Sequence, residues 1–238
     1  MIRIAFIASV IGLAAFATVP VAANDWSGTV DLGASSSSGN SEVTTVTGTT
    51  KLVRDGQNWR NTIKGDLAYA EDQGIRSTER YAASFKTDLK LDSSWFLFAI
   101  ADGALDEFGG VRKRASGALG VGKGFFRTKA GSFLEAEIGA GMRYQEDQAG
   151  FDEDEAIGRF ALTGEFVIND GIVFAQSINV EGGDTNIATI SDSALRFDIM
   201  KGVFAKLGVN VHHNSGVPAG TEKTDTLTTF SVGYKFGK

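Results

Sequence analysis

The chain has 238 residues, with 29 acidic and 23 basic side chains and a formal net charge of −6 at neutral pH. This acidic balance argues against a nucleic-acid-binding protein, which needs a basic face. Cysteine is absent, which excludes a thiol enzyme, a disulfide framework and a lipid-anchored N-terminal cysteine. The length suits a single domain.

The N-terminus has the layout of a secretory signal peptide. Arg3 precedes an uncharged apolar run over residues 4–16, and Pro20 and Ala23 belong to a small-residue end. We therefore expect residues 1–23 to be a cleaved signal peptide and residues 24–238 to form the mature domain. The alternative is an uncleaved membrane anchor, because residues 4–23 carry no charge and are just long enough to span a bilayer.

Beyond this segment no apolar stretch approaches 18 residues, so a transmembrane helix is not expected. Apolar and polar residues instead alternate with a period of two, which indicates β-strands. Asn169-Asp170-Gly171 is typical of a tight hairpin turn. The pattern predicts twelve strands, at residues 26–35, 42–54, 58–70, 78–91, 95–106, 112–124, 132–145, 156–168, 172–181, 190–200, 203–213 and 224–236.

The connections between these strands are predicted to alternate in length. The odd ones are polar and mostly longer, such as 71–77 and 146–155, whereas most even ones are tight, such as 55–57. An even number of long strands with alternating connections is typical of an all-β, transmembrane antiparallel up-and-down β-barrel with periplasmic turns and external loops. The alternative is a soluble secreted β-sandwich, whose strands are usually about half as long.

Aromatic residues support the barrel interpretation. Trp26, Trp59, Trp95 and Phe236 fall at predicted periplasmic strand ends, and Tyr69, Phe108 and Tyr144 near outer ends, as interface girdles require. In the last strand, Phe230, Val232, Tyr234 and Phe236 are expected to face lipid, and the strand is expected to pair with the first around Val30 and Leu32. Both faces of strand 95–106 are apolar, so its orientation is open.

Charged side chains fall on the polar, inward face of the predicted strands. Such a lining fits either a salt-bridged, largely closed interior or a narrow hydrated pore, because charges inside a protein must form ion pairs or remain hydrated. The expected inward charges are Asp31, Lys51, Arg60, Lys64, Asp66, Lys86, Asp88, Arg112, Arg114, Glu135, Glu137, Arg143, Arg159, Glu165, Asp192, Arg196, Asp198 and Lys206.

No catalytic, cofactor-binding or metal-binding residue is expected. His212 and His213 are adjacent on a strand, so they point to opposite faces and only one could join a nucleophilic site. The acidic run 152–155 lacks the glycine and ligand spacing of an EF-hand, and is interpreted as a solvated external loop. Specific calcium binding and weak cation bridging to lipopolysaccharide are the alternatives, and the bridging is favoured over the calcium site. The glycines of 117–124 precede no helix and do not form a nucleotide loop.

Several motifs in a fixed order resemble the YdiY-like family, a domain of unknown function described as salt-induced outer-membrane proteins. They are Trp26-Ser27-Gly28, the segment 33–41 (GASSSSGNS), 106–110 (DEFGG) with Arg112, Gly117, Gly120 and Gly122, 137–143 (EIGAGMR), 223–226 (KTDT) and 233–236 (GYKF). The resemblance covers essentially the whole mature chain. It implies an outer-membrane barrel associated with salt or osmotic stress, and no established catalytic residues.

The expected function is therefore that of a non-enzymatic, porin-like outer-membrane barrel, with a narrow channel for ions or small solutes as the first hypothesis. A structural or adhesive surface barrel with a closed lumen is the alternative, and a lipid enzyme in the barrel wall is a distant third. Expected partners are outer-membrane lipids, lipopolysaccharide and the barrel-assembly machinery, with no nucleic acid and no cofactor.

Overall fold

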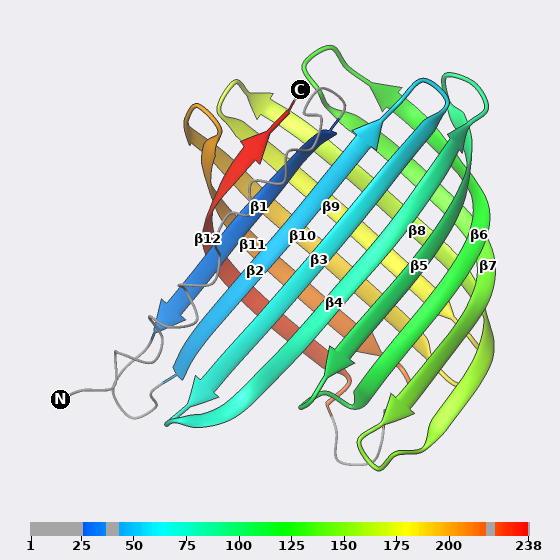
Figure 1. Ribbon diagram of the computed structural model, residues 1–238, viewed down its shortest axis with the longest axis vertical. Coiled ribbons are helices and arrows are strands. Elements are labelled where there is room, and N and C mark those ends of the chain that lie inside the picture. Colours follow the sequence, from blue (N-terminus) through cyan, green and yellow to red (C-terminus); the bar gives the residue numbers. More distant parts are fainter. Residues whose placement is uncertain (1–25, 37–42, 218–221, 238) are drawn as a thin grey trace.

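The computed structural model describes residues 26–36, 43–217 and 222–237. The predicted signal peptide, residues 1–23, lies outside this part of the chain. Twelve antiparallel strands make up the described residues (Figure 1). Their bounds are β1 Trp26–Ser36, β2 Val43–Asp55, β3 Trp59–Asp72, β4 Ile75–Lys90, β5 Trp95–Asp106, β6 Val111–Arg127, β7 Phe133–Asp147, β8 Asp152–Asn169, β9 Ile172–Gly182, β10 Ile187–Met200, β11 Val203–Asn214 and β12 Thr224–Phe236.

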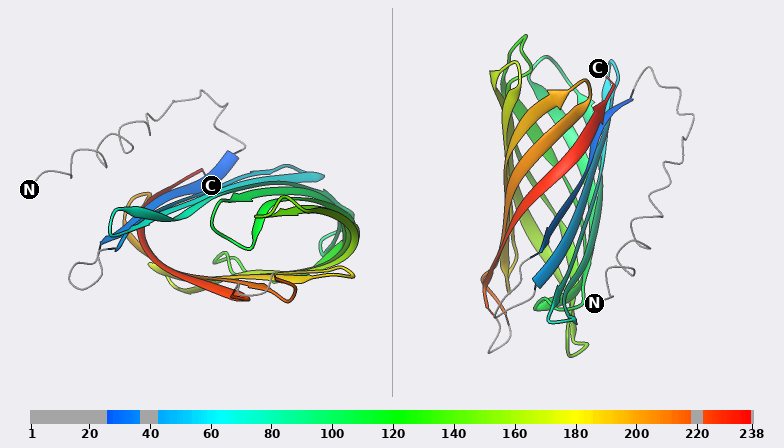
Figure 2. Two further views of the ribbon diagram at one scale, coloured as in Figure 1. Left: turned by 90° about the horizontal axis from the view of Figure 1, so that it is seen from below. Right: turned by 90° about the vertical axis from the view of Figure 1, so that its left-hand side faces the viewer.

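Each strand pairs with its neighbours in sequence, and β1 pairs with β12 to close the sheet into a barrel. At this seam Val30 lies opposite Tyr234 and Leu32 opposite Val232, which confirms the predicted pairing. The two strands run side by side in Figure 1. The pairing joins Gly28–Gly33 of β1 to Ser231–Phe236 of β12. Along this part of the seam, closure satisfies backbone groups that would cost several kcal/mol each if left unpaired in hydrocarbon. Seen along its axis, the barrel is flattened into an oval (Figure 2).

The predicted loop at residues 71–77 is wrong. β3 continues to Asp72 and β4 starts at Ile75, so only Gln73 and Gly74 form the turn. Both have positive φ, 51° and 79°, which is the geometry of the tight hairpin turn that matches the twist of paired strands. The predicted alternation of short and long connections therefore fails at this position, because the polar residues around the turn continue the ladder.

The predicted bounds of β5 and β12 agree with the structure, and other bounds shift by up to four residues. The largest shift is at β8, which begins at Asp152 instead of residue 156. The acidic run 152–155 is therefore strand and not loop, which corrects the prediction. Polar sequence does not end a strand here, because the neighbouring β7 extends equally far and pairs with it, with Glu155 opposite Arg143.

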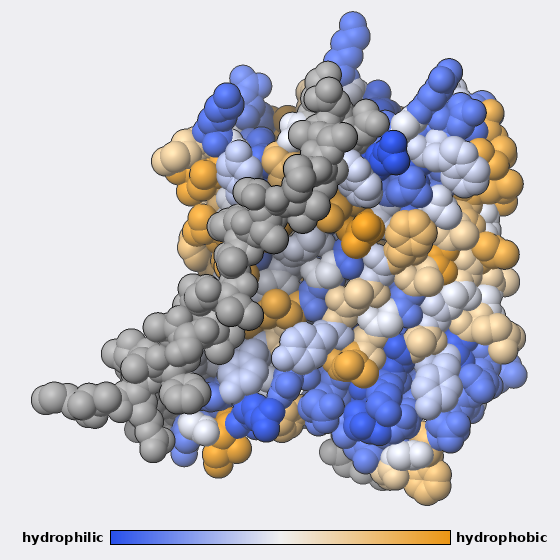
Figure 3. Space-filling model, in the orientation of Figure 1, coloured by the Kyte–Doolittle hydropathy of each residue, from blue (hydrophilic) through white to orange (hydrophobic). Residues whose placement is uncertain are grey.

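The outer face of the barrel is apolar. Phe160 is 46% exposed and Phe230 is 61% exposed, as predicted for side chains that face lipid. Trp59 and Trp95 are exposed at the turn ends of β3 and β5, where an interface girdle belongs. In the face shown in Figure 3, hydrophilic residues gather at the two ends of the strands and hydrophobic residues cover much of the wall between them. An apolar belt between two polar ends is typical of a barrel wall that faces the hydrocarbon of a membrane.

Within 26–36, 43–217 and 222–237, no helix has the length and apolar character needed to cross a membrane.

Candidate functional site in the barrel lumen

The interior of the barrel is the candidate site, because strand alternation sends the charged side chains there. On β3, for example, Arg60, Lys64 and Asp66 share the inward face, while Ile63 and Leu67 are exposed on the outside. Most of the predicted inward charges form ion pairs with other inward residues, which confirms their face. Arg112 lies at a bulge of β6 and pairs with Glu146 near the loop end.

One set of ion pairs lies nearer the turn ends of the strands. The Arg60 guanidinium donates two hydrogen bonds to Glu135, at 2.8 and 2.7 Å, and a third to Asp88 at 2.7 Å. Lys86 bridges Asp88, at 2.9 Å, to Glu137. These five residues are called the turn-side network. Because Asp88 is 1% exposed, its charge depends on these partners.

Two phenylalanines of β5 pack against cations of the turn-side network inside the barrel. Their position shows which face of β5 points inward, which the sequence left open. Phe96 and Phe98 point inward and are buried. The Phe96 ring lies 5.2 Å from the Arg60 guanidinium and 5.1 Å from the Lys86 ammonium, within cation–π range. A Cβ on Gly122 would lie 2.1 Å from Phe96, so glycine on β6 makes the room that the ring occupies.

A second set of ion pairs lies nearer the loop ends. Arg143, 1% exposed, pairs with Glu155, and Arg159 donates to Glu181 at 2.8 Å. Arg114 pairs with Glu181 at 2.5 Å. These residues, here the loop-side network, join β6, β7, β8 and β9. Arg143 also donates to the backbone carbonyl of Asn186 at 2.8 Å, which ties the β9–β10 connection to the wall.

A smaller polar cluster crosses the seam where the barrel closes. The Lys206 ammonium on β11 lies 2.6 Å from Asp31 on β1, and Ser231 on β12 donates to Asp31 at 2.8 Å. Thr49 on β2 donates to the same carboxylate at 2.5 Å. One buried acceptor therefore holds four strands together, on the inside of the pairing between β1 and β12.

Among the described residues, two contacts join strands that lie five or six positions apart in the closed order, and these are called the cross-lumen contacts. Lys51 on β2 reaches Glu165 on β8 at 3.2 Å, and these strands lie six positions apart in the closed order of twelve, on opposite sides of the barrel. Nearer the loop ends, Arg80 on β4 lies 2.8 Å from the Nε2 of His212 on β11. Because a guanidinium has only donors, His212 accepts this bond. Both contacts narrow the interior.

The lumen has a basic wall and an acidic wall. Inward charges on β2–β4 are mostly basic, and those on β7–β10 are mostly acidic. Such an arrangement places a transverse electric field across the narrow dimension of the interior. The basic wall carries Lys51, Arg60, Lys64, Arg80 and Lys86 against Asp66 and Asp88, and the acidic wall carries Glu135, Glu137, Glu155, Glu165, Glu181, Asp192 and Asp198 against Arg143, Arg159 and Arg196.

Three inward charges in the middle of the strands differ from the rest. Lys64, Asp66 and Asp192 are exposed, and none has an ion-pair partner within 4 Å among the described residues. Asp192 accepts hydrogen bonds from Ser177, at 3.2 Å, and from Asn210. These three residues are called the mid-lumen cluster. They lie between the two contacts that cross the lumen, in a part of the interior that water reaches.

Sequence reasoning missed several lumen residues. Arg80 shares the face of Lys86 on β4, so alternation alone could have found it. Asp102 was missed because the orientation of β5 was left open. Glu155 was missed because it was assigned to a loop, and Glu181 because it was the last residue of a predicted strand. No local signal could show that Arg80 meets His212, because the two residues are 132 positions apart.

The two histidines lie on opposite faces, as predicted. His212 points into the lumen toward Arg80, and the Nδ1 of His213 lies 2.8 Å from the Thr224 hydroxyl. In the described ranges, no group of three or more His, Cys, Asp or Glu side chains has an arrangement that could hold a metal ion. The acidic run contributes Glu155 to the loop-side network.

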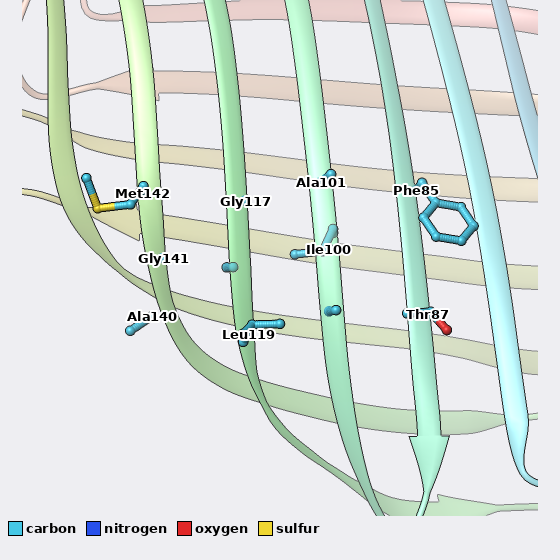
Figure 4. Close-up of a pocket in the computed structure, with 11 residues that line it drawn as sticks. Phe85, Thr87, Ile100, Ala101, Gly117, Leu119, Ala140, Gly141 and Met142 are labelled. Carbon is cyan, nitrogen blue, oxygen red and sulfur yellow. The ribbon is translucent and has the colours of Figure 1, made fainter.

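A shallow groove of about 380 Å³ lies on the outer wall across β4–β7 (Figure 4). Small side chains at Ala101, Gly117 and Ala140 form its floor, and Phe85, Leu119 and Met142 stand at its rim. Its lining is apolar and faces the surrounding hydrocarbon, so it is separate from the charged lumen.

Residues 30–236 match a family model described as "Protein of unknown function, DUF481". The uncharacterized protein YdiY of Escherichia coli (strain K12) is 28% identical over 208 residues, which cover 87% of this chain and 82% of that protein.

Among solved structures, the NanC porin superposes with a TM-score of 0.52 and 13% identity, covering 89% of this chain and all of the other. The translocator domain of the autotransporter NalP from Neisseria meningitidis has a TM-score of 0.47 and 12% identity, covering 96% of this chain and 92% of that one. The likeness to the porin shows the fold alone.

Proposed function

The chain belongs to the DUF481 family of proteins of unknown function, and we propose that it forms a narrow outer-membrane channel for ions and small hydrophilic solutes. The observation that carries this proposal is the exposure of Lys64, Asp66 and Asp192 inside a closed barrel. Charged groups without ion-pair partners stay in the interior of a barrel only if water reaches them. Facing basic and acidic walls give ions of both signs a favourable path.

The cross-lumen contacts set the width of this path. Lys51 and Glu165 approach to 3.2 Å, and Arg80 approaches His212 to 2.8 Å. The channel is therefore expected to pass ions and small solutes and to exclude large ones. The Lys51 and Glu165 side chains are partly exposed, so this contact is held weakly enough to be displaced by permeating ions.

Planar-bilayer conductance of the refolded protein tests the proposal. We expect small, regular current steps, and larger steps for Lys51→Met, because this substitution removes the charged end of one cross-lumen contact. Lys129→Met is the matched control, since Lys129 lies in the exposed turn between β6 and β7. A folded, inserted barrel that gives no steps would contradict the proposal.

The second candidate is a structural or adhesive surface barrel with a closed lumen, and the two cross-lumen contacts favour it. In that case both the native protein and Lys51→Met would insert without conducting. Binding of the refolded barrel to a surface would then depend on its loops, so replacing residues 148–151 by a short glycine and serine linker would reduce binding without changing insertion.

We also propose that the protein is exported by a signal peptide cleaved after Ala23 and assembled in the outer membrane by the barrel-assembly machinery, among outer-membrane lipids and lipopolysaccharide. The mass of the mature protein should then correspond to a chain that starts at Asn24. Deleting Gly233–Lys238 should abolish membrane insertion and leave export intact, because Gly233–Phe236 pairs with β1. Recovery of this truncated protein as an inserted, heat-modifiable species would contradict the assembly proposal.

The association with salt stress is a proposal that rests on the family resemblance. Protein abundance should rise in cells grown with added NaCl. Cells given sucrose at equal osmolarity separate a response to ions from a response to osmotic pressure, and unchanged abundance in both would contradict the association.

We propose that the barrel acts without catalysis. His212 contacts a guanidinium and not a nucleophile, which supports this proposal. Phospholipid vesicles incubated with the refolded protein should release no fatty acid, and release that His212→Ala abolishes would overturn it.

A further inference from the structure

The mid-lumen cluster occupies a bounded section of the interior. Lys51 lies opposite Lys64 in the β2–β3 register, and its contact with Glu165 marks the turn side. The Arg80–His212 contact marks the loop side, since both residues lie toward the loop ends of their strands. A molecule that moves through the barrel must pass Lys64, Asp66 and Asp192 between these two contacts.

The cluster differs from the two networks in having free charges. Lys64 and Asp66 have no hydrogen-bond or ion-pair partner among the described residues, although both point into the same lumen as Arg60 and Lys86. Lys51 lies opposite Lys64 on the neighbouring strand, and Asp66 lies two residues further along β3 on the same inward face. The section therefore holds one ammonium and two carboxylates that are exposed and have no ion-pair partner among the described residues.

The position of Asp192 on β10 is fixed by its neighbours. Ser177 on β9 and Asn210 on β11 both donate to its carboxylate. A carboxylate held in one orientation on β10, and an ammonium on β3 five strands away in the closed order, form two opposite charges on separate walls. A ligand that carries both charges can therefore replace water at both walls at once.

We propose that the mid-lumen cluster is a binding and selectivity site for small zwitterions that carry an ammonium and a carboxylate, as amino acids do. The ligand carboxylate meets Lys64, and the ligand ammonium meets Asp192 and Asp66. Two carboxylates against one ammonium give the section a net negative charge, so it disfavours dianions of similar size. This inference rests on the proposed channel.

Liposome swelling tests the site with three probes of similar size: alanine as the zwitterion, succinate as the dianion and glycerol as the neutral solute. Alanine should enter roughly fivefold faster than succinate, the ratio that about 1 kcal/mol produces. Lys64→Met, Asp66→Asn and Asp192→Asn should each reduce this ratio, with glycerol entry through the same variant as the internal reference. Lys129→Met and Asp170→Asn, which remove charges from exposed turns, are the matched controls.

The outcomes separate the site from the channel. If a folded, inserted barrel admits none of the three probes and no ions, the proposed function itself fails. If glycerol enters but alanine shows no advantage over succinate, the channel stands and the zwitterion site is overturned. The site is also overturned if the alanine advantage persists in all three cluster variants. Asp66→Asn keeps the test valid if Asp192→Asn disturbs folding, because Asp66 has no partner to lose.

Discussion

The loop-side network and the mid-lumen cluster use the same kinds of side chain on the same face of the barrel, but their surroundings differ. Arg143 is 1% exposed and has Glu155 as its partner, whereas Lys64 is exposed and has no ion-pair partner in the part of the chain that the structure describes. A charge removed from water must be paired, and a hydrated charge need not be. An inward charge in this barrel therefore stabilises the wall where it is buried, and is available to solutes where it is hydrated.

Removing one partner from the buried set should give the largest effect on stability. Arg143→Met leaves the buried Glu155 without its cation, whereas Glu181 keeps Arg159 and Arg114. The substitution is expected to lower the free energy of unfolding by about 3–5 kcal/mol. Lys64→Met should change it by less than about 1 kcal/mol, since no ion pair is lost. Urea-dependent unfolding in lipid vesicles measures both, and equal effects would remove the distinction between the two regions.

The same charge should have different costs on the two faces of β8, because one face meets hydrocarbon and the other meets the lumen. Phe160→Arg places a charge on the lipid side of the wall and should cost about 2–4 kcal/mol near the middle of the membrane. Thr163→Arg places the same charge on the lumen side, near Glu135, and should be tolerated. The yield of heat-modifiable protein on folding into vesicles compares them. Similar yields would contradict the assignment of the faces.

The aromatic layer under the turn-side network should show a smaller effect. Gly122→Ala places a Cβ 2.1 Å from the buried Phe96 ring. The Arg60 and Lys86 cations lie over this ring and limit its movement. Such overpacking is expected to cost about 1–3 kcal/mol. Gly124→Ala on the same strand is the control, because its nearest contact is 3.7 Å away. Equal unfolding midpoints for the two variants would show that the ring moves without cost.

The smallest effect is expected at a charge that lies entirely outside the lumen. In the turn between β4 and β5, the backbone N–H groups of Trp95 and Ser94 donate to Asp92, and they lower the pKa of its carboxyl. A lowered folded-state pKa gives stability above the usual value of about 3.9 that is lost as pH falls through the folded-state value. Asp92→Asn should slightly flatten the acid side of the pH dependence of unfolding, and an unchanged slope would contradict this role.

Much of the architecture followed from the sequence because it depends on local periodicity. Alternation with a period of two assigns each side chain to one face, so the outward Phe160, the inward Arg60 and the number of strands were all predictable. Predicted strand ends differ most from the structure where polar residues continue the backbone pairing between strands. The acidic residues at the start of β8 form a strand because β7 pairs with them. The turn between β3 and β4 has only two residues, Gln73 and Gly74, because these strands pair with each other up to the turn.

By itself, the sequence determined a closed antiparallel barrel with an apolar outside and a charged inside, because both properties arise from residues close together in the chain. Only the tertiary structure decided which inward charges meet. Lys51 and Glu165 are 114 positions apart, and Arg80 and His212 are 132 apart. Barrel closure and its flattened cross-section bring these pairs together and leave Lys64, Asp66 and Asp192 without ion-pair partners among the described residues. Pairing across a lumen depends on strand order, tilt and width rather than on alternation.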